Sequence, residues 1–352
     1  MDILLTSKLN PEVLNLLQHI ERFQENWNFQ AHLSPDFYAD LKKTSIITSA
    51  GASTRIEGST LTDDEIKERL NGLKIQKITS RDEAEVAGYI DCKEYILEHY
   101  EELEISEHTI RSLHQMMMQY LSEDLFPRNQ KGAYKNITNS VVKIDHSTGT
   151  QEIVFETTPP GPQTEVAMLN LVQNFKNFIS DKQYSALEII AAFIVQFLAI
   201  HPFRDGNGRI SRLLTDLCLL KHGYTFCMYS SHEKVIEDTK TQYYVALRQT
   251  QESFTKNVDI NPWFFYFLKT LKKQTEYLQN KATPISAGTL TKKENIVLEL
   301  IQKHQPVSIG FLERQSKINR ATLKAILTRL KQSNTIKMEG ERKGSRYWIH
   351  EP

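Results

Sequence analysis

The sequence predicts a mainly α-helical protein, with one β-hairpin in a helical core and a small C-terminal unit of three helices and a β pair. Apolar residues recur at helical spacing through most of the chain, and two β-rich runs, 140–145 and 151–157, interrupt that pattern. The stretch 281–289 is typical of a linker. The 352 residues are enough for two or three domains. We expect domains at 1–75, 76–280 and 286–352.

The composition is that of an ordinary globular protein. Hydrophobic residues make up 40% of the chain, and 43 basic residues balance 43 acidic ones, so the whole chain is not a polyanion binder. The cysteines, Cys92, Cys218 and Cys227, lack the spacing of a metal site or disulfide framework, which favours reduced thiols in a cytoplasmic protein. No signal peptide is evident, and the longest apolar run, 189–200, is too short to span a bilayer.

Capping residues mark where several helices begin. Ser80 precedes Glu83 by three residues and Ser185 precedes Glu188 by three, which is the spacing of a capping box. Ser106 is expected to cap another helix. We expect helices over 10–45, from 62 to about 72, from 80 through 95, from 106, over 185–200, from the Gly-Asn-Gly turn at 206–208 to about 223, up to 251, and from 262.

A stretch of twelve residues, His201-Pro-Phe-Arg-Asp-Gly-Asn-Gly-Arg-Ile-Ser-Arg212, lies between two strongly apolar helices. It ends one helix, turns at Gly-Asn-Gly and starts the next helix with arginines. Because a helix N-terminus favours anions, Arg209 and Arg212 there indicate that an anion is the intended occupant. Gly206 and Gly208 let the backbone turn and approach a ligand. A glycine loop that opens a helix is, in physical terms, a phosphate cradle.

Two further residues of this stretch can carry chemistry. His201 titrates close to neutral pH and is a candidate general base. Asp205 would hold a divalent cation against phosphates. Arg209 and Arg212 are three apart, so they share a helix face and can grip one polyphosphate. A histidine before a turn, or a Gly-Asn-Gly turn, is more often structural when it occurs alone, and only the combination indicates a site.

The stretch resembles the signature of the Fic family, H-x-F-x-[DE]-G-N-G-R-x-x-R, at every specified position: His201, Phe203, Asp205, Gly206, Asn207, Gly208, Arg209 and Arg212. The resemblance covers roughly residues 35–280. It implies a protein adenylyltransferase, which transfers AMP from ATP to a Ser, Thr or Tyr hydroxyl of a target protein, releases pyrophosphate and uses Mg²⁺. Self-modification is expected as well.

The resemblance also implies a role for each residue of the motif. His201 would deprotonate the target hydroxyl, and Asp205 would bind Mg²⁺ that bridges the α- and β-phosphates. The backbone of 206–208 and Asn207 would form an anion hole. Arg209 would hold the β- and γ-phosphates and Arg212 the γ-phosphate. Phe203 would anchor the loop in the core, and Arg204 is counted with the nucleotide-binding residues.

A second motif precedes the core. Ser53 and Glu57 are four apart and lie on one face of any helix, with Gly58 following. Alone, this pattern is a solvated helix end with Gly58 as its C-cap. Beside the 201–212 stretch it resembles the inhibitory motif of Fic proteins, [S/T]-x-x-x-E-[G/N]. The resemblance implies that Glu57 pairs with Arg212 and occupies the arginine that ATP needs.

The predicted hairpin, 140–145 with 151–157, resembles the flap that lies over the nucleotide in Fic proteins. A free flap edge could take up the backbone of the target as an added strand and place its hydroxyl at the α-phosphate. The alternative is a surface hairpin without a role. Further along, Tyr243 and Tyr244 would lie near the adenine, and Gln251 stands where relatives often have an asparagine that contacts the base.

The C-terminal 286–352 region is similar to a winged helix-turn-helix domain. It holds thirteen Lys or Arg against six Asp or Glu, a net charge of +7, so residues 1–285 carry −7. Its basic residues suit a nucleic-acid backbone. They are Arg320, Lys324, Arg329, Lys331, Lys337, Arg342, Lys343 and Arg346. A protein-docking or dimerisation module, and with it a homodimer, is an equally weighted alternative, because fold alone does not fix function.

Two alternatives to AMP transfer stay open. The same family architecture can remove AMP, with the inhibitory glutamate aiding hydrolysis, so the sequence does not fix the direction. The chain could also be a DNA-binding regulator whose Fic core only senses nucleotide. The intact catalytic set argues against this regulator, since a sensor has no need of His201.

Overall fold

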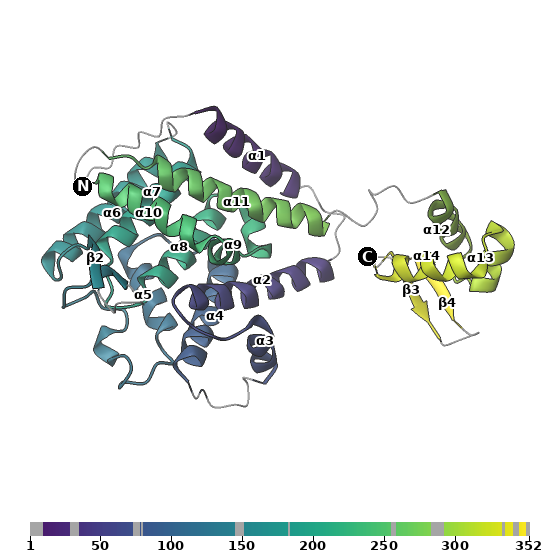
Figure 1. The fold of residues 1–352 in the computed structure, drawn as a ribbon, viewed down its shortest axis with the longest axis horizontal. Coiled ribbons are helices and arrows are strands. Elements are labelled where there is room, and N and C mark those ends of the chain that lie inside the picture. The colour runs from purple at the N-terminus through teal and green to yellow at the C-terminus, as the bar shows by residue number, and fades with distance from the viewer. Residues whose placement is uncertain are drawn as a thin grey trace. The chain divides into compact units, whose positions relative to one another are not determined.

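The computed structural model describes residues 10–28, 35–72, 78, 80–144, 151–181, 184–254, 258–282, 292–332, 335–340 and 345–349. These residues form two compact units, one within 1–31 and 36–278, the other within 32–35 and 279–352. The described part of the chain contains fourteen α-helices, two short 3₁₀ helices and two two-stranded sheets (Figure 1). The prediction of a mainly α fold with one hairpin in the core is confirmed.

The described part of the first unit is mostly helical, with the hairpin between η1 and α6. Their bounds are α1 Pro11–Asn28, α2 Pro35–Ile56, α3 Asp63–Gly72, α4 Arg81–His99, α5 Glu107–Met117, η1 Arg128–Gln130, α6 Pro162–Ser180, α7 Ala186–Ile200, α8 Asn207–Lys221, η2 Thr225–Tyr229, α9 His232–Asp238, α10 Lys240–Ser253 and α11 Asn261–Ala282. The caps predicted at Ser80 and Ser106 are confirmed, because their hydroxyls accept the N–H of Glu83 and Thr109. The capping box predicted at Ser185 is wrong. Ser185 precedes α7, but its hydroxyl makes no cap bond and its carbonyl accepts the Glu188 N–H instead.

Helices α7 and α8 form the centre of this unit. Helix α7 is apolar all round and buried, as a helix enclosed by other elements must be. It packs against α6 and α8, and α8 also packs against α4 and α5. The leucines of α8 are buried, Leu213, Leu214 and Leu217 completely so. Burial of each such side chain contributes about 1.5–3 kcal/mol to the free energy of folding. The loop between α7 and α8 is therefore attached to two stably packed helices.

The predicted hairpin is present in the described residues. Strand β1, Ser140–Ile144, pairs antiparallel with β2, Gln151–Glu156, and the register shifts between Val141 and Val142. A bulge of this kind bends a strand and increases its twist. Residues 145–150, which join the strands, lie outside the described residues.

The second unit consists of α12 Lys292–His304, α13 Ile309–Ser316, α14 Arg320–Gln332, β3 Ile336–Glu339 and β4 Arg346–Ile349. The two strands are antiparallel. The core of the unit is apolar and includes Val297, Ile301, Leu312, Leu323 and Leu330. Most of the predicted linker 281–289, together with Arg342 and Lys343, lies outside the described residues. Among the helices that are described, none is both long and apolar enough to cross a membrane.

Candidate active site

The loop between α7 and α8 is held in a conformation that few residues adopt. His201 ends α7 with φ 53° and ψ 58°, and Gly206 opens α8 with φ 82°. A left-handed conformation at a residue other than glycine costs about 1–3 kcal/mol and persists where the surroundings fix it. Two bonds do so here. The His201 N–H donates to Phe197 O at 2.9 Å, and Pro202 O accepts the Lys135 N–H at 2.7 Å.

Three side chains shape the rest of this loop. Asn207 binds Phe203 twice, accepting its N–H at 2.9 Å and donating to its carbonyl at 2.7 Å. The Phe203 ring is fully buried and stacks on His114, with the ring centres 3.9 Å apart. Phe203 is therefore a core anchor. Asn207 thus fixes the loop with its amide oxygen and one of its two amide hydrogens.

His201 has the orientation that a general base needs. Its Nδ1 lies 3.2 Å from the carbonyl of Leu198, and a carbonyl can only accept, so Nδ1 carries the proton. Nε2 is then unprotonated and able to accept a proton. Burial, and to a smaller extent the positive charge of Lys135, lower the pKa of His201 below its usual value. The imidazole is therefore neutral at neutral pH, as the base role requires.

The carboxylate of Glu57 lies close to Gly208, in the first turn of α8. The first N–H groups of a helix have no intrahelical acceptor and carry partial positive charge. A side chain at Gly208 would place its Cβ 2.4 Å from Glu57 Oε1, so only glycine allows the carboxylate to come this close. Helix α2 ends in a Schellman motif, with Gly58 at φ 110° and bonds from Gly58 N–H to Arg55 O and from Ser59 N–H to Thr54 O. This motif fixes Glu57 at the helix end.

Arg212 joins Glu57 to Ser53. Its Nη2 lies 2.7 Å from Glu57 Oε1 and 2.9 Å from Ser53 O, and its Nε donates to Ser53 Oγ at 2.8 Å. The Arg212 side chain is 3% exposed and that of Glu57 34%. The structure thus brings together the three residues of the predicted inhibitory contact. The helix-end interpretation of Gly58 holds at the same time.

Arg209 and Asp205 connect the loop to α4. Arg209 is buried and pairs with Glu85 of α4 at 3.0 Å and with Asp205 at 3.2 Å. Arg81 of α4 binds the other Asp205 oxygen at 2.8 Å. Burial opposes ionisation of Asp205, but the charge of Arg209 and the Gly206 N–H hold its pKa below the usual range. Arg209 thus binds two carboxylates, and Asp205, whose side chain is 38% exposed, is an ionised group open to solvent.

The remaining predicted residues differ in burial. Arg204 is exposed, whereas Gln251 is buried. Tyr243 is 3% exposed and packs edge-on against Trp263, while Tyr244 is 37% exposed. Burial, and then the nearby charge of Glu57, raise the pKa of Tyr244 to about 12.

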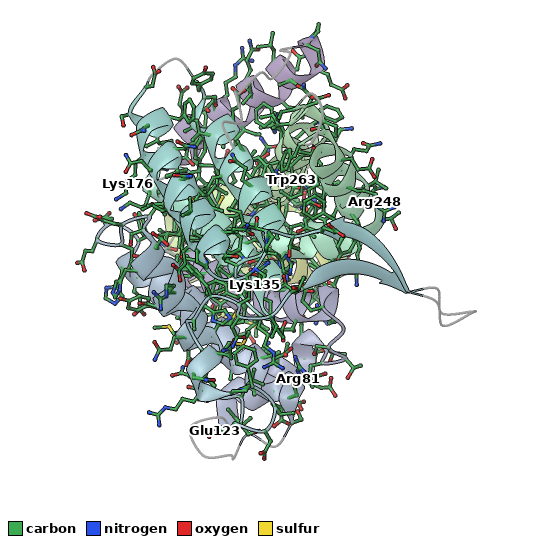
Figure 2. The ribbon with its side chains drawn as sticks, turned by 90° about the vertical axis from the view of Figure 1, so that its left-hand side faces the viewer. Arg81, Glu123, Lys135, Lys176, Arg248 and Trp263 are labelled. Carbon is green, nitrogen blue, oxygen red and sulfur yellow. The ribbon has the colours of Figure 1, made fainter. Side chains whose placement is uncertain are left out.

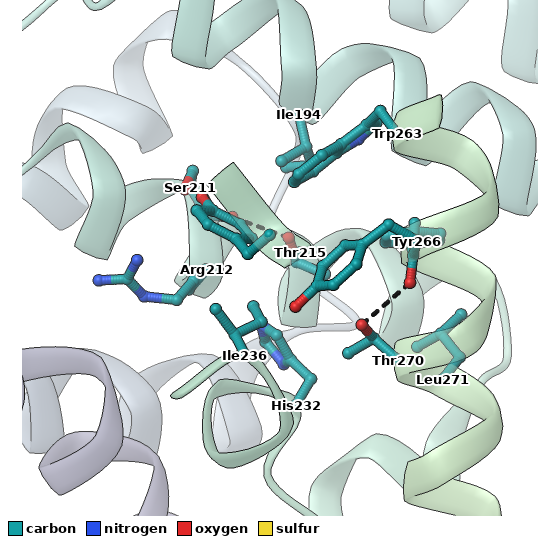
Figure 3. Close-up of a pocket in the computed structure, with 12 residues that line it drawn as sticks. Ile194, Ser211, Arg212, Thr215, His232, Ile236, Trp263, Tyr266, Thr270 and Leu271 are labelled. Atoms are coloured by element: carbon teal, nitrogen blue, oxygen red, sulfur yellow. Dashed lines mark hydrogen bonds between the residues drawn. The ribbon is translucent and has the colours of Figure 1, made fainter. Parts of the chain in front are cut away.

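A small cavity lies behind Arg212, and its walls include Tyr243, His232, Trp263 and Tyr266 (Figure 3). Figure 3 shows the Arg212 guanidinium extending away from the other lining side chains. The cavity measures about 20 Å³, which is room for about one water. It is therefore an internal gap and not the nucleotide site.

The sequence analysis missed a buried charge cluster beneath the site. Lys93 of α4 bonds Asp216 of α8 and, at 3.3 Å, Glu233 of α9, and all three side chains are fully buried. Glu233 also accepts the Ser49 hydroxyl of α2 at 2.8 Å and the Tyr89 hydroxyl at 2.7 Å. Asp216, His232 and Glu233 each offer one atom that could bind a metal ion, and these three atoms lie within 4.8 Å of one another. The Lys93 ammonium already supplies the positive charge between the two carboxylates, so the cluster joins α2, α4, α8 and α9 as an ion network.

Replacing Lys93 with methionine should destabilise the fold by about 3–5 kcal/mol, because two buried carboxylates would lose their counter-charge. Urea unfolding followed by circular dichroism measures this. Lys176→Met is the matched control. Lys176 pairs with Glu104 at 3.6 Å in an exposed bridge, which is worth about 0–1 kcal/mol. Equal loss of stability in the two variants would contradict the network.

The region that contains this site is similar to known proteins. Residues 104–219, which include the 201–212 loop, match the model of the Fic/DOC family. A Fido domain-containing protein of Dictyostelium discoideum is 32% identical over 95 residues, 27% of this chain and 62% of that protein. The protein adenylyltransferase Fic of Drosophila grimshawi is 31% identical over 163 residues, 44% of this chain and 31% of that protein. The matched region thus spans less than two thirds of either relative.

Two solved structures share the fold. One is a Fic family protein from Desulfovibrio desulfuricans G20, with a TM-score of 0.62, 20% identity and 97% of both chains covered. The other is a Fic domain containing signaling protein from Bacteroides thetaiotaomicron, with a TM-score of 0.61, 24% identity, and 75% of this chain and 97% of that chain covered. Residues 104–219 of the chain thus match the Fic/DOC family, and the loop from His201 to Arg212 lies within the matched region.

Proposed function

We propose that this chain is a protein adenylyltransferase that transfers AMP from ATP to a Ser, Thr or Tyr hydroxyl of a target protein and releases pyrophosphate. The observation that carries the proposal is the contact of the Glu57 carboxylate with Gly208 and Arg212, which supports an anion site beside the loop that bears His201. The name of the Drosophila relative, protein adenylyltransferase Fic, supports the same activity.

The reaction needs few chemical groups from the protein. His201 Nε2 takes the proton of the target hydroxyl, and the oxygen attacks the α-phosphorus of ATP. A bond forms between that oxygen and the α-phosphorus, while the bond to the oxygen shared with the β-phosphate breaks and pyrophosphate leaves. The N–H groups at 206–208, with Arg209 and Arg212, compensate the negative charge of the triphosphate. Phosphoryl-type transfer depends mainly on such positioning and charge compensation.

The residues present fit a Mg²⁺ ion. Asp205 supplies an ionised, partly exposed carboxylate, and Mg²⁺ in enzymes is usually held by one or two carboxylates together with substrate phosphates. The Asp205 oxygens bind Arg81 and Arg209 in the structure, so these two arginines would share the carboxylate with the ion. When bound, Mg²⁺ would withdraw charge from the phosphates and make pyrophosphate a better leaving group.

The hairpin supports a role in binding the target protein. It is a two-stranded sheet, and an extended segment can add to such an edge by backbone hydrogen bonds. A groove of about 380 Å³ runs beside it, lined among others by Phe155 of β2, Asn170 of α6 and Ile200 of α7. Ile200 immediately precedes His201. We propose that the residues flanking the target hydroxyl lie along this edge and groove.

We also propose that Glu57 inhibits the enzyme, because it occupies the Arg212 side chain that the γ-phosphate would need. Helix α2 is held firmly enough for this. Lys240 of α10 binds the Ile56 carbonyl at 2.6 Å, and Arg55 pairs with Glu237 of α9 at 2.5 Å. Ile56 itself is 3% exposed, and Ile46 and Ile47 are buried too. Inhibition would end when α2 or Glu57 moves away from α8.

Mass spectrometry tests the proposed activity. The full chain with Glu57→Gly, which removes the proposed inhibition, is incubated with ATP and Mg²⁺, alone and with a cell lysate, and intact mass and peptide spectra are recorded. The proposal requires the mass of one AMP group on Ser, Thr or Tyr residues, together with released pyrophosphate. Release of free AMP from modified proteins, with none added, would instead support the AMP-removing alternative.

For the C-terminal unit we propose binding to duplex DNA. The exposed face of α14 carries the basic residues Arg320, Lys324 and Lys331, with Ala321 and Ala325 between them. Arg320 also pairs with Glu313 at 3.2 Å, and Arg329 with Glu294 at 3.1 Å. Small residues between basic ones let a helix approach a DNA groove closely, while the basic residues meet phosphates.

DNA affinity of the full chain should therefore fall steeply as salt is raised, because bound counterions are released. Lys324→Glu should weaken binding and reduce the slope of log affinity against log salt by about 1. Lys303→Glu, with the same charge change on α12, is the control and should change the slope less. Filter binding or fluorescence anisotropy measures both. Retention by a protein partner, with no DNA binding at low salt, would favour the docking alternative.

A further inference from the structure

Lys135 is a buried ammonium that the reaction as described does not use. It lies between η1 and β1 and is 1% exposed. Its Nζ donates to Asn139 Oδ1 at 2.7 Å, Thr157 Oγ1 at 2.7 Å and Ile200 O at 3.1 Å. All three acceptors are neutral, and in the described structure no carboxylate pairs with it. Burying a charge without an opposite charge costs free energy of folding, so we expect Lys135 to have a role that offsets this cost.

Each acceptor of Lys135 is next in the chain either to a strand of the hairpin or to His201. Asn139 immediately precedes β1, Thr157 immediately follows β2, and Ile200 immediately precedes His201. The backbone N–H of Lys135 also donates to Pro202 O at 2.7 Å. A single residue thus connects both ends of the hairpin with both sides of His201. Figure 2 shows Lys135 beside the base of the two strands.

The acceptors are bonded to one another as well. The Thr157 hydroxyl lies 2.5 Å from the Asn139 carbonyl, and the Asn139 amide donates to the Phe203 carbonyl at 2.9 Å. The hairpin ends and the 200–203 loop therefore form one closed network around the ammonium. His201 has a left-handed backbone within this network, which it could not keep without support.

We propose that Lys135 is a positioning residue for AMP transfer, which fixes the hairpin relative to His201 so that a target segment bound along the hairpin presents its hydroxyl to Nε2. This inference rests on the proposed function. It explains why a cation is needed, since one ammonium can donate three hydrogen bonds in three directions, whereas a neutral amide of similar size donates two.

The charge of Lys135 also acts on His201. Burial is the first cause of the lowered pKa of His201, and Lys135 lowers it further, while Glu57 and Asp205 raise it. These are the charged groups that face the imidazole. Removing the ammonium should move the acid limb of the pH–rate profile to higher pH, and replacing it with another cation should not.

Hydrogen exchange tests the proposal without relying on activity. In the full chain, Lys135→Met should speed amide exchange in 140–144 and 151–157 by about tenfold or more, as expected for the loss of a charge-assisted hydrogen bond. Thr157→Val removes one acceptor and should act in the same direction if Lys135→Met does not fold. Lys131→Met is the control, because that ammonium binds the carbonyls of Gln119 and Leu121 instead. Unchanged exchange in both Lys135→Met and Thr157→Val would overturn the proposal.

Kinetics in a Glu57→Gly chain provide the second measurement. Lys135→Met should lower kcat about tenfold or more and leave the Kd of ATP unchanged. It should also move the acid limb of the pH–rate profile to higher pH, and Lys135→Arg should return that limb to its position in the Glu57→Gly chain. If Lys135→Met leaves both kcat and the acid limb of the pH–rate profile as they are in the Glu57→Gly chain, the positioning role is contradicted. If the Glu57→Gly chain itself transfers no AMP, the proposed function fails, while the exchange experiment still decides whether Lys135 fixes the hairpin.

Discussion

His201→Ala should lower the rate of AMP transfer by about 10²–10⁴-fold, the usual contribution of a general base, and leave ATP binding unchanged. The reason is geometric. Nδ1 of His201 is bonded to Leu198 O, so Nε2 is the free nitrogen, and it acts on the target hydroxyl and not on the triphosphate. Label incorporation and ATP binding by calorimetry measure the two quantities separately.

The wild-type pH profile provides the matching control. Because the pKa of His201 lies below the usual 6.5, the imidazole is already neutral at pH 7. Transfer should therefore stay constant from pH 7 downward until the pH passes through the lowered pKa, and only then fall. Transfer by His201→Ala at a rate near that of wild type would remove His201 from the mechanism.

Glu57→Gly should raise self-modification roughly ten- to hundredfold. An exposed ion pair is worth only about 0–1 kcal/mol, which could not hold an enzyme inactive. Arg212, however, is 3% exposed and also bound by Ser53. A hydrogen bond to a charged group in such a site is worth about 1.5–3 kcal/mol, which corresponds to this range of rates. A complete switch needs about 5.5 kcal/mol, and ATP binding would supply the remainder.

Two companion variants separate inhibition from a loss of packing. Glu57→Asp should activate less, since the shorter carboxylate can still come near Arg212. Arg212→Ala should not activate, because it also removes the grip on the γ-phosphate. All four proteins are compared for labelling at equal ATP. Equal labelling by wild type and Glu57→Gly would mean that Glu57 is only the end of α2.

The sequence predicts best what neighbouring residues determine. The loop from His201 to Arg212 combines a helix end, two glycines and a helix start, and all of these are local signals. The resemblance to the inhibitory motif of Fic proteins predicts that Glu57 pairs with Arg212, and in the structure both Ser53 and Glu57 bind Arg212. The caps at Ser80 and Ser106 follow from local spacing too. Ser185 shows the limit, because the same spacing does not determine which way a hydroxyl turns.

What the sequence could not predict depends on residues far apart in the chain. Arg209 pairs with Glu85 on another helix, and Lys93 pairs with Asp216 and Glu233. Nothing near Lys135 indicates that its ammonium reaches both ends of the hairpin and Ile200. Such pairings arise from the packing of α4, α7, α8 and α9, which periodicity does not specify. The division into three domains and the nucleotide contacts of Tyr243, Tyr244 and Gln251 stay predictions.

The central claim is that this site attaches AMP, and a comparison of two labels tests it most directly. The Glu57→Gly chain is incubated with Mg²⁺ and with ATP labelled at either the α- or the γ-phosphate, and the protein is then separated. Label from the α-phosphate should stay on the protein, and label from the γ-phosphate should leave as pyrophosphate. Retention of the γ-label, or of neither label, would contradict the account.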